Sequence, residues 1–292
     1  MNLYPGASIN AAGSLRRRTR WISGAAAAVV AVSLLVVTTP SGAAPHARTS
    51  RGAHRGIMRA EFPIGIRDAL EPSGVAPPPP DALAGYRRTY LTDFGGSALP
   101  GGWGTFDGTP SGDDQSQWRP SHVVVSGGVV RLIASKDATG QWITGGISQS
   151  GVGRAYGAYF VRSRVTGPGP DQDEMLWPVA PVWPPEVDFN EMGNSTTATS
   201  WTVHYGHGRA FVQSTRNVNM ERWHTWGLIW TPTSMTFTVD GHPWGVLTDY
   251  AEIPHQAMTL DVQQQVWCQP DLACPTRASA IEVDWVAEYA RV

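Results

Sequence analysis

The thirteen residues from His122 to Ala134 read HVVVSGGVVRLIA, and they indicate how this chain folds. Two runs of β-branched residues flank the tripeptide Ser126-Gly127-Gly128. β-branched side chains suit extended strands, and paired glycines supply the left-handed backbone conformations of a two-residue turn. The stretch therefore predicts a β-hairpin.

Other segments repeat the strand pattern further along the chain. Residues 159–165 (YFVRSRV) alternate apolar and polar side chains, residues 235–239 (MTFTV) do so before an Asp240-Gly241 turn, and residues 281–289 alternate again. Because no stretch of the C-terminal two thirds keeps a 3.6-residue period over three turns, we expect an all-β fold. Many short strands with regular turns predict a sandwich, jelly roll or barrel. Two curved antiparallel sheets would offer a concave cleft to an extended ligand.

The composition excludes several classes of protein. The 292 residues are 16% charged and 41% hydrophobic, which is too polar for a protein with several membrane spans. The 32 glycines and 23 prolines favour turns and short strands over long helices. A formal net charge of −2 argues against a nucleic-acid partner.

The N-terminus has the three parts of an export signal. Arg16, Arg17, Arg18 and Arg20 form a positive block, an apolar run covers residues 22–37, and small residues at 41–44 offer a cleavage site. The run is about 16 residues, shorter than the roughly 20 needed to span a bilayer. We therefore predict a signal peptide over residues 1–44 and a secreted protein with no membrane contact in its mature form. An uncleaved anchor is the alternative, and the export route, general or twin-arginine, stays open.

The rest of the chain divides at about residue 85. Residues 45–85 hold several Arg, few large apolar residues and four consecutive prolines at 77–80, so we interpret them as a Pro-rich linker or disordered arm. Residues 86–292 have one composition and are long enough for a single core. We expect this domain to be a monomer.

Cys268 and Cys274 are the only cysteines, and six positions separate them. Export would place them in an oxidising compartment, where disulfides persist. We predict a local disulfide that closes a surface loop, with a pair of free thiols as the alternative.

The sharpest chemical feature is a group of carboxylates in Trp183-Pro-Pro-Glu-Val-Asp-Phe-Asn-Glu191. On a regular strand Glu186 and Asp188 share a face, because side chains alternate with period 2. Glu191 would point to the opposite face unless one β-bulge, at Phe189 or Asn190, restores it to the same side. Since bulges are enriched beside active sites, we predict one here.

Three carboxylates on one face repel one another, so at least one pKa should rise. A retaining glycosidase needs this arrangement, with an ionised nucleophile and a protonated acid roughly 5–5.5 Å apart. Two other interpretations fit the acidic motif alone: a solvated acidic edge, and a calcium site, because carboxylates suit hard cations.

The motif resembles the catalytic strand of glycoside hydrolase family 16, Glu-x-Asp-x-(x)-Glu, in its longer, bulged form. The hairpin at 122–134 resembles the family's early hairpin, and Trp177-Pro178 resembles the Trp-Pro that precedes the catalytic strand. Residues 226–241 (WGLIWTPTSMTFTVDG) and 281–292 (IEVDWVAEYARV) are similar to later strands of the family. The resemblance covers about residues 90–292.

The resemblance implies a β-jelly-roll sandwich of the concanavalin A-like type, which hydrolyses internal β-glycosidic bonds of a polysaccharide with retention. Position by position, Glu186 would be the nucleophile, Glu191 the general acid/base, and Asp188 the residue that holds and orients the nucleophile. No cofactor is implied, although family members often hold a structural calcium away from the cleft. We predict no metal at the site itself, since His204 and His207 lack a third ligand.

Five further residues are candidates for binding sugar. Indole rings stack on the apolar faces of sugars, which favours Trp177 and Trp183, with core packing as the alternative. His204 resembles a family position that faces the cleft. Gln263 and Gln265 alternate on one face of a late strand, with a polar outer face as the alternative. Trp223, Trp226, Trp230 and Trp285 fit strand patterns typical of a core.

The substrate is less specified than the chemistry. The bulged motif resembles members that act on β-1,3-glucans and marine galactans, so we favour a β-1,3- or mixed-linkage glucan. The chain departs from the family pattern where substrate would bind, for example with Pro185 in place of Gly, which keeps a galactan open. A non-catalytic carbohydrate-binding protein would not need an acid pair, and a transglycosylase would use the same residues as the hydrolase.

Overall fold

The computed structural model describes residues 61–110, 115–149, 151–180, 182–208, 210–268 and 274–292, all within the unit Gly56–Val292. The predicted signal peptide and the first part of the predicted linker lie outside the described residues. Among the residues that are described, the one helix is the short 3-10 turn η1 (Pro120–His122), and no helix has the length and apolar character needed to cross a membrane.

The larger of two main sheets has ten strands, almost all paired antiparallel. In spatial order its strands are β17 (His242–Leu247), β16 (Ser234–Val239), β15 (His224–Thr231), β10 (Gly157–Val165), β19 (Ser279–Arg291), β7 (Val129–Lys136), β8 (Trp142–Thr144) and β5 (Ser116–Trp118). Two further strands extend it, β3 (Tyr86–Thr92) beside β19 and β6 (Val123–Ser126) beside β7.

The smaller sheet has seven strands and carries the acidic motif on one of its central strands. Its order is β14 (Ala210–Asn217), β13 (Ala198–Tyr205), β12 (Glu186–Glu191), β11 (Asp171–Pro178), β18 (Met258–Gln265), β9 (Gly146–Ser148) and β4 (Gly104–Thr105). A separate two-stranded sheet joins β1 (Ile66–Arg67) and β2 (Val75–Ala76).

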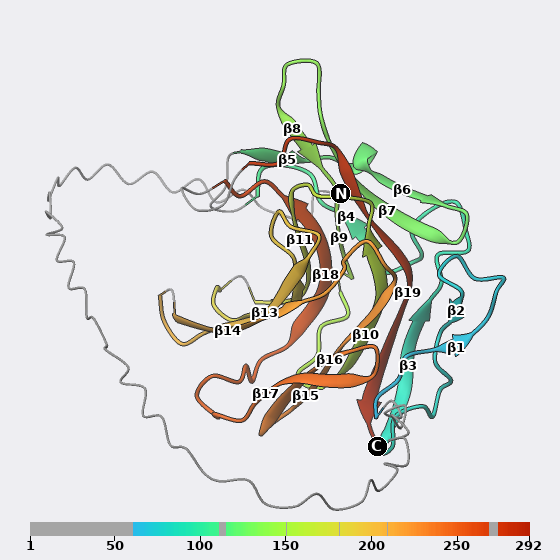
Figure 1. The fold of residues 1–292 in the computed structure, drawn as a ribbon. Helices are drawn as coiled ribbons and strands as arrows, with labels where there is room; N and C mark the ends of the chain where they lie inside the picture. Colours follow the sequence, from blue (N-terminus) through green and yellow to red (C-terminus); the bar gives the residue numbers. More distant parts are fainter. Residues whose placement is uncertain (1–60, 111–114, 150, 181, 209, 269–273) are drawn as a thin grey trace, which may run out of the picture. The chain divides into compact units, whose positions relative to one another are not determined.

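The two main sheets form curved layers, with β11, β13, β14 and β18 in one and β10, β15, β16 and β19 in the other (Figure 1). Apolar side chains of both sheets meet in one core cluster. Trp201 of the smaller sheet stacks on Phe237 of the larger one, with ring centroids 4.5 Å apart. Trp226, Trp230 and Trp285 are buried, as predicted, whereas Trp223 is only half-buried. These features confirm the predicted all-β jelly-roll sandwich of two curved antiparallel sheets.

Both predicted hairpins are present. Strands β6 and β7 flank Gly127 and Gly128, which have φ angles of 62° and 77°. Strands β16 and β17 flank Asp240 and Gly241, with φ angles of 48° and 75°. Two successive positive φ angles are typical of the type I′ turn, whose twist matches that of the strands it joins.

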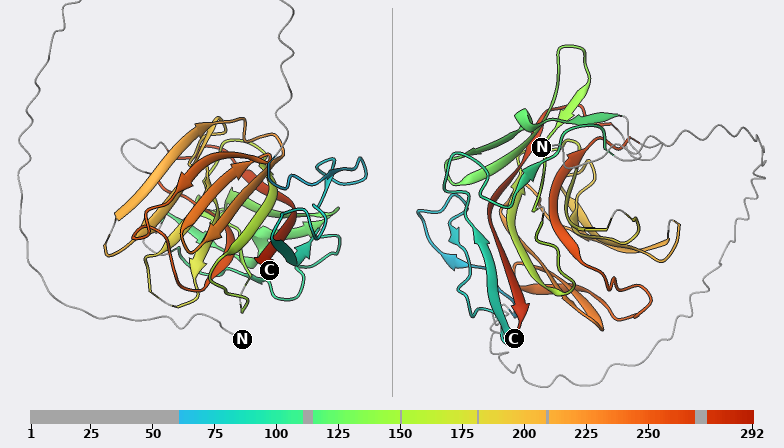
Figure 2. Two further views of the ribbon diagram at one scale, coloured as in Figure 1. Left: turned by 90° about the horizontal axis from the view of Figure 1, so that it is seen from below. Right: turned by 180° about the vertical axis from the view of Figure 1, so that it is seen from behind.

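The prediction of a linker or disordered arm is wrong for residues 61–85. This segment, called the strap below, packs against the larger sheet on the side away from the smaller one (Figure 2). Leu83 is buried in a cluster with Phe160 and Tyr289, and the hydroxyl of Tyr289 donates to the carbonyl of Pro79. The composition does not predict this packing, because a few anchoring residues, rather than a continuous apolar face, hold the strap against the sheet.

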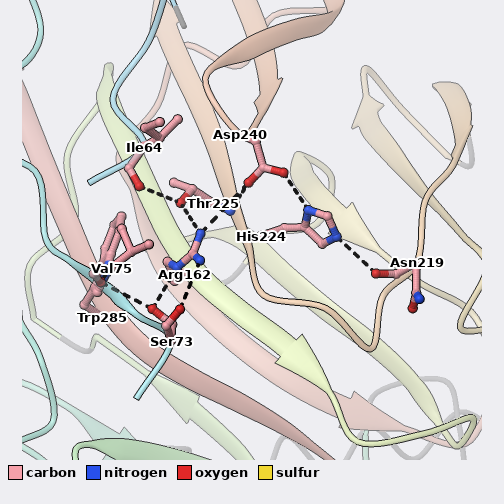
Figure 3. Close-up of polar contacts among 9 residues, drawn as sticks. All are labelled: Ile64, Ser73, Val75, Arg162, Asn219, His224, Thr225, Asp240 and Trp285. Carbon is pink, nitrogen blue, oxygen red and sulfur yellow. Dashed lines mark hydrogen bonds and ion pairs between the residues drawn. The ribbon is translucent and has the colours of Figure 1, made fainter. Parts of the chain in front are cut away.

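Polar contacts fix the strap as well (Figure 3). The buried Arg162 donates from Nε to the hydroxyl of Ser73 over 2.8 Å and from Nη1 to the hydroxyl of Thr225 over 3.1 Å. Thr225 in turn donates to the carbonyl of Ile64, and the Trp285 indole donates to the carbonyl of Val75. The strap thus satisfies donors of the sheet that would otherwise be buried without partners.

Candidate active site

A β-bulge brings the three carboxylates of the acidic motif to one face. On β11, Glu174 pairs with Asn190 and Met175 pairs with Asp188, so Phe189 has no partner. On β13, the residues opposite Glu186, Asp188 and Glu191 are His204, Thr202 and Ser200. Because these three partners are two positions apart and paired residues share a face, all three carboxylates lie on the same face. The predicted bulge at Phe189 or Asn190 is confirmed, and the extra residue is Phe189.

Each of the three carboxyls has different neighbours. Glu186 accepts a hydrogen bond from the indole nitrogen of Trp183 over 2.6 Å. Asp188 is buried, and its Oδ2 lies 4.0 Å from Nε2 of His204. Glu191 accepts from the hydroxyl of Thr202 over 2.5 Å.

Burial shifts the protonation of all three groups. It raises the pKa of Glu186 to about 7, although the hydrogen bond from Trp183 acts in the opposite direction. Burial, and then the charges of Glu186 and Glu191, raise the pKa of Asp188 well above its usual range. Burial also raises the pKa of Glu191, against the effect of its hydrogen bonds from Thr202 and Gln213. The motif therefore keeps protons to a higher pH than separate carboxyls would.

Three more carboxyls share this face, and the sequence analysis missed them. Asp173 pairs with Glu191 across β11 and β12, and Asp171 lies two residues earlier on the same face. Asp261 on β18 pairs with Met175, which itself pairs with Asp188. The alternation Asp171-Gln172-Asp173 in a strand-like run could have revealed two of them. We call this side of the sheet the acidic face, with the carboxyls Asp171, Asp173, Glu186, Asp188, Glu191 and Asp261.

Asp171, Asp173 and Glu191 approach one another closely, with one oxygen of each within 4.8 Å of the others. Among the described residues they are the only group of three or more acidic, His or Cys side chains so arranged. Close, buried carboxyls of this kind repel one another, and a shared proton relieves the repulsion, as a bound cation would. A structural calcium elsewhere stays a prediction.

Aromatic rings line one side of Glu186. The ring of His204 lies between those of Trp183 and Phe211, with centroid distances of 5.4 Å and 5.7 Å. Trp183 is 40% exposed and Phe211 is 56% exposed, so both offer ring surface to solvent. Burial lowers the pKa of His204, which favours the neutral ring. Phe211 had no sequence signal that set it apart from a core residue.

The other predicted binding residues also lie on the acidic face. Trp177 is half-buried and follows Met175 by two positions on β11. Gln265 and Gln263 pair with Asp171 and Asp173. The amide of Gln263 donates to Oδ2 of Asp173 over 3.4 Å, so part of its hydrogen-bonding capacity is already used. Trp201, on the neighbouring strand β13, is buried in the core on the opposite side of the sheet.

The predicted disulfide between Cys268 and Cys274 is confirmed. It lies just beyond the end of β18, the strand that carries Gln263 and Gln265. It therefore limits the movement of the chain that leaves the acidic face.

Comparisons with known proteins agree with this geometry. The family model described as glycosyl hydrolases family 16 matches residues 113–287. A laminarinase from Flavobacterium sp. UMI-01 is similar in structure, with a TM-score of 0.63 and 17% identity over 70% of this chain and 100% of that one. The β-glucanase of Bacillus licheniformis has a TM-score of 0.59 and 19% identity over 69% of this chain and 98% of that one.

A third similar structure contains a sugar. It is a family 16 protein from the mixed-linkage glucan locus of Bacteroides ovatus, in complex with the product G4G4G3G. Its TM-score is 0.56, with 18% identity over 68% of this chain and 99% of that one. A comparison with curated protein sequences returns no match.

Proposed function

The chain belongs to glycosyl hydrolases family 16, and on that premise we propose that it is a retaining endo-β-glucanase that cleaves a β-1,3- or mixed-linkage glucan. Family membership makes it a glycosidase that acts on a glycan. The observation that carries the finer proposal is the bulge at Phe189, which sets Glu186, Asp188 and Glu191 on one face.

In the proposed reaction, Glu186 attacks the anomeric carbon while Glu191 gives its proton to the leaving glycosidic oxygen. This step forms a covalent glycosyl-enzyme, and water then attacks the anomeric carbon as Glu191 takes the water's proton. The hydrogen bond from Trp183 supports Glu186 as the nucleophile, because it stabilises the carboxylate form. Asp188, buried between Glu186 and Glu191, would hold the nucleophile in place.

We propose that the aromatic residues hold the sugar ring nearest Glu186. Trp183 and Trp177 would stack on apolar sugar faces, and His204 would hydrogen-bond a hydroxyl with its neutral ring. Gln263 and Gln265 would contact hydroxyls on the side of Asp171 and Asp173. The exposed rings of Trp183 and Phe211 support a platform on this side.

The charge of the acidic face supports a neutral glycan. Six carboxyls share it, and those that are ionised would repel sulfate groups. A sulfated galactan is therefore disfavoured relative to a glucan. The printed activities of the similar structures, laminarinase and β-glucanase, support the same choice.

We further propose that the mature protein is secreted and works as a monomer. The disulfide Cys268–Cys274 supports an oxidising compartment, as does the Arg block ahead of the apolar run at residues 22–37. Mass spectrometry of the exported protein would give its N-terminus.

The direct test is a panel of soluble glycans: laminarin, lichenan, carboxymethylcellulose, agarose and κ-carrageenan. We expect laminarin or lichenan to yield oligosaccharides of several lengths, and proton NMR during hydrolysis to show the β-anomer first. Binding to a glycan without any products would instead favour a carbohydrate-binding protein. Longer products from a mixture of oligosaccharides would indicate a transglycosylase.

A further inference from the structure

We propose that Asp173 is a positioning residue for Glu191: its carboxyl group shares a proton with Glu191 and so keeps available the proton that Glu191 gives to the leaving oxygen. This inference rests on the proposed function, since it assigns Glu191 the acid/base role. In the first step the shared proton moves from the Asp173–Glu191 pair to the glycosidic oxygen. In the second step the proton of the attacking water restores it.

The geometry places the two groups side by side. Asp173 is directly opposite Glu191 in the β11–β12 register, and the oxygens of Asp171, Asp173 and Glu191 lie within 4.8 Å of one another. Asp173 is only 5% exposed. At such a separation, away from water, two ionised carboxylates repel strongly, and the pair is most stable with one proton between them.

Asp173 has a free oxygen for that proton. Its Oδ2 accepts a long hydrogen bond of 3.4 Å from Gln263, while its buried Oδ1 has no partner. Asp171 is bound differently, because the backbone N–H groups of Gly193 and Gln172 both donate to its Oδ1. Those bonds fix the position of Asp171, although burial and the charge of Glu191 outweigh them and raise its pKa to about 7.

Glu191 needs such a neighbour because its other partners favour its ionised form. Thr202 donates to Oε2 over 2.5 Å, and Gln213 donates to the same oxygen over 3.5 Å. Donors to a carboxylate stabilise the anion, which an acid must avoid. Burial, together with the charges of Asp171 and Glu191, raises the pKa of Asp173 well above its usual range, in agreement with a retained proton.

The strands around the acidic face, as far as the structure describes them, bring no positive charge to it. Among the described strand residues that the register places on the acidic face there is no Lys or Arg. The titratable groups that face the pair from the strands around it are Asp171 on β11, Glu186 and Asp188 on β12, His204 on β13 and Asp261 on β18.

The first test is the pH profile of kcat/KM for Asp173→Asn on the best glycan of the panel. Asparagine cannot share the proton or repel the Glu191 anion, so Glu191 should lose its proton more easily and the alkaline limb should move to lower pH by about one unit. Asp173→Glu should restore most of the shift. Asp261→Asn is the matched control, since Asp261 is buried on the same face but lies outside the group around Glu191, and it should leave the alkaline limb in place.

A second measurement does not depend on turnover. Carboxyl-¹³C NMR follows the titration of Glu191, identified by the signal that Glu191→Gln lacks. Its midpoint should be lower in Asp173→Asn than in the wild type. An unchanged midpoint in folded Asp173→Asn would overturn the inference, as would an alkaline limb that moves with added Ca²⁺ or EDTA, which would mean that the group binds a cation. If the wild type cleaves no glycan, the proposed function fails, and the NMR titration still tests the proton sharing.

Discussion

The indole nitrogen of Trp183 donates a hydrogen bond to Oε2 of Glu186 over 2.6 Å, although Trp183 belongs to the segment before β12 and is 40% exposed. One side chain thus combines an open ring face with a direct contact to the proposed nucleophile. In the proposed function, Trp183 would therefore couple sugar binding to the ionisation of Glu186.

We predict that Trp183→Phe moves the acidic limb of the kcat/KM profile to higher pH. The hydrogen bond from Trp183 lowers the pKa of Glu186, so its loss should raise that pKa, and the nucleophile would then ionise only at higher pH. The shift should be about one pH unit. Phe211→Ala is the control, because it removes an exposed ring without a hydrogen bond to Glu186. If kcat/KM falls by the same factor at every pH, Trp183 acts by stacking alone.

We predict that Glu186→Gln and Glu191→Gln each abolish turnover of the glycan without unfolding the protein. The two variants should differ on an aryl β-glucoside oligomer whose leaving group needs no proton. Glu191→Gln should release the aryl group in a burst, while Glu186→Gln should not, because it lacks the nucleophile. Circular dichroism checks the fold, and a Glu186→Gln variant with wild-type activity on every substrate would remove the nucleophile assignment.

Asp188→Asn should lower kcat less than either glutamate substitution, by roughly 10- to 1,000-fold. Burial and the charges of Glu186 and Glu191 raise the pKa of Asp188, so the three groups titrate together and the pH profile should change along with the rate. Initial-rate assays from pH 4 to 9 measure both kcat and the shape of its pH profile. If the profile keeps its shape, Asp188 does not tune the nucleophile.

Glu174 gives a prediction for stability. It lies on the core side of β11, and burial raises its pKa to about 8, only partly opposed by Ser163 and Asn190. A carboxyl with a raised folded-state pKa stabilises the fold at low pH, and this contribution is lost as the pH rises from about 4.5 to about 8. Glu174→Gln should therefore flatten the decrease of Tm over this range, and the exposed Glu221→Gln should not. Equal effects of Glu174→Gln at pH 5 and pH 8 would contradict the assignment.

The strap should contribute to stability through Leu83. Leu83→Ala removes a buried side chain that packs with Phe160 and Tyr289, so it should lower the free energy of unfolding by about 2–4 kcal/mol. Leu70 is on the same segment but 94% exposed, so Leu70→Ala should change the free energy of unfolding by less than about 0.5 kcal/mol. Urea unfolding of the two variants measures the difference, and equal midpoints would mean that the strap does not fold with the sheet.

Local patterns predicted the hairpins and the bulge because each depends on a few neighbouring residues. The Gly127-Gly128 and Asp240-Gly241 turns need only their own backbone conformations, and the two-residue period of β12 required one extra residue before Glu191. The pairing of Asp173 with Glu191 could not be predicted in this way, because it depends on the register between β11 and β12. The strap was missed for a similar reason, since its anchors are side chains more than 80 residues away in sequence, such as Arg162 and Tyr289.

The crowding of six carboxyls on one sheet face has a consequence for inhibition. A glycosidase transition state carries positive charge on the sugar ring, and the carboxyls of this surface that are ionised would attract such charge over a distance. Iminosugars that are protonated near neutral pH should therefore bind more tightly than uncharged lactones of the same shape, with an advantage that shrinks as ionic strength rises.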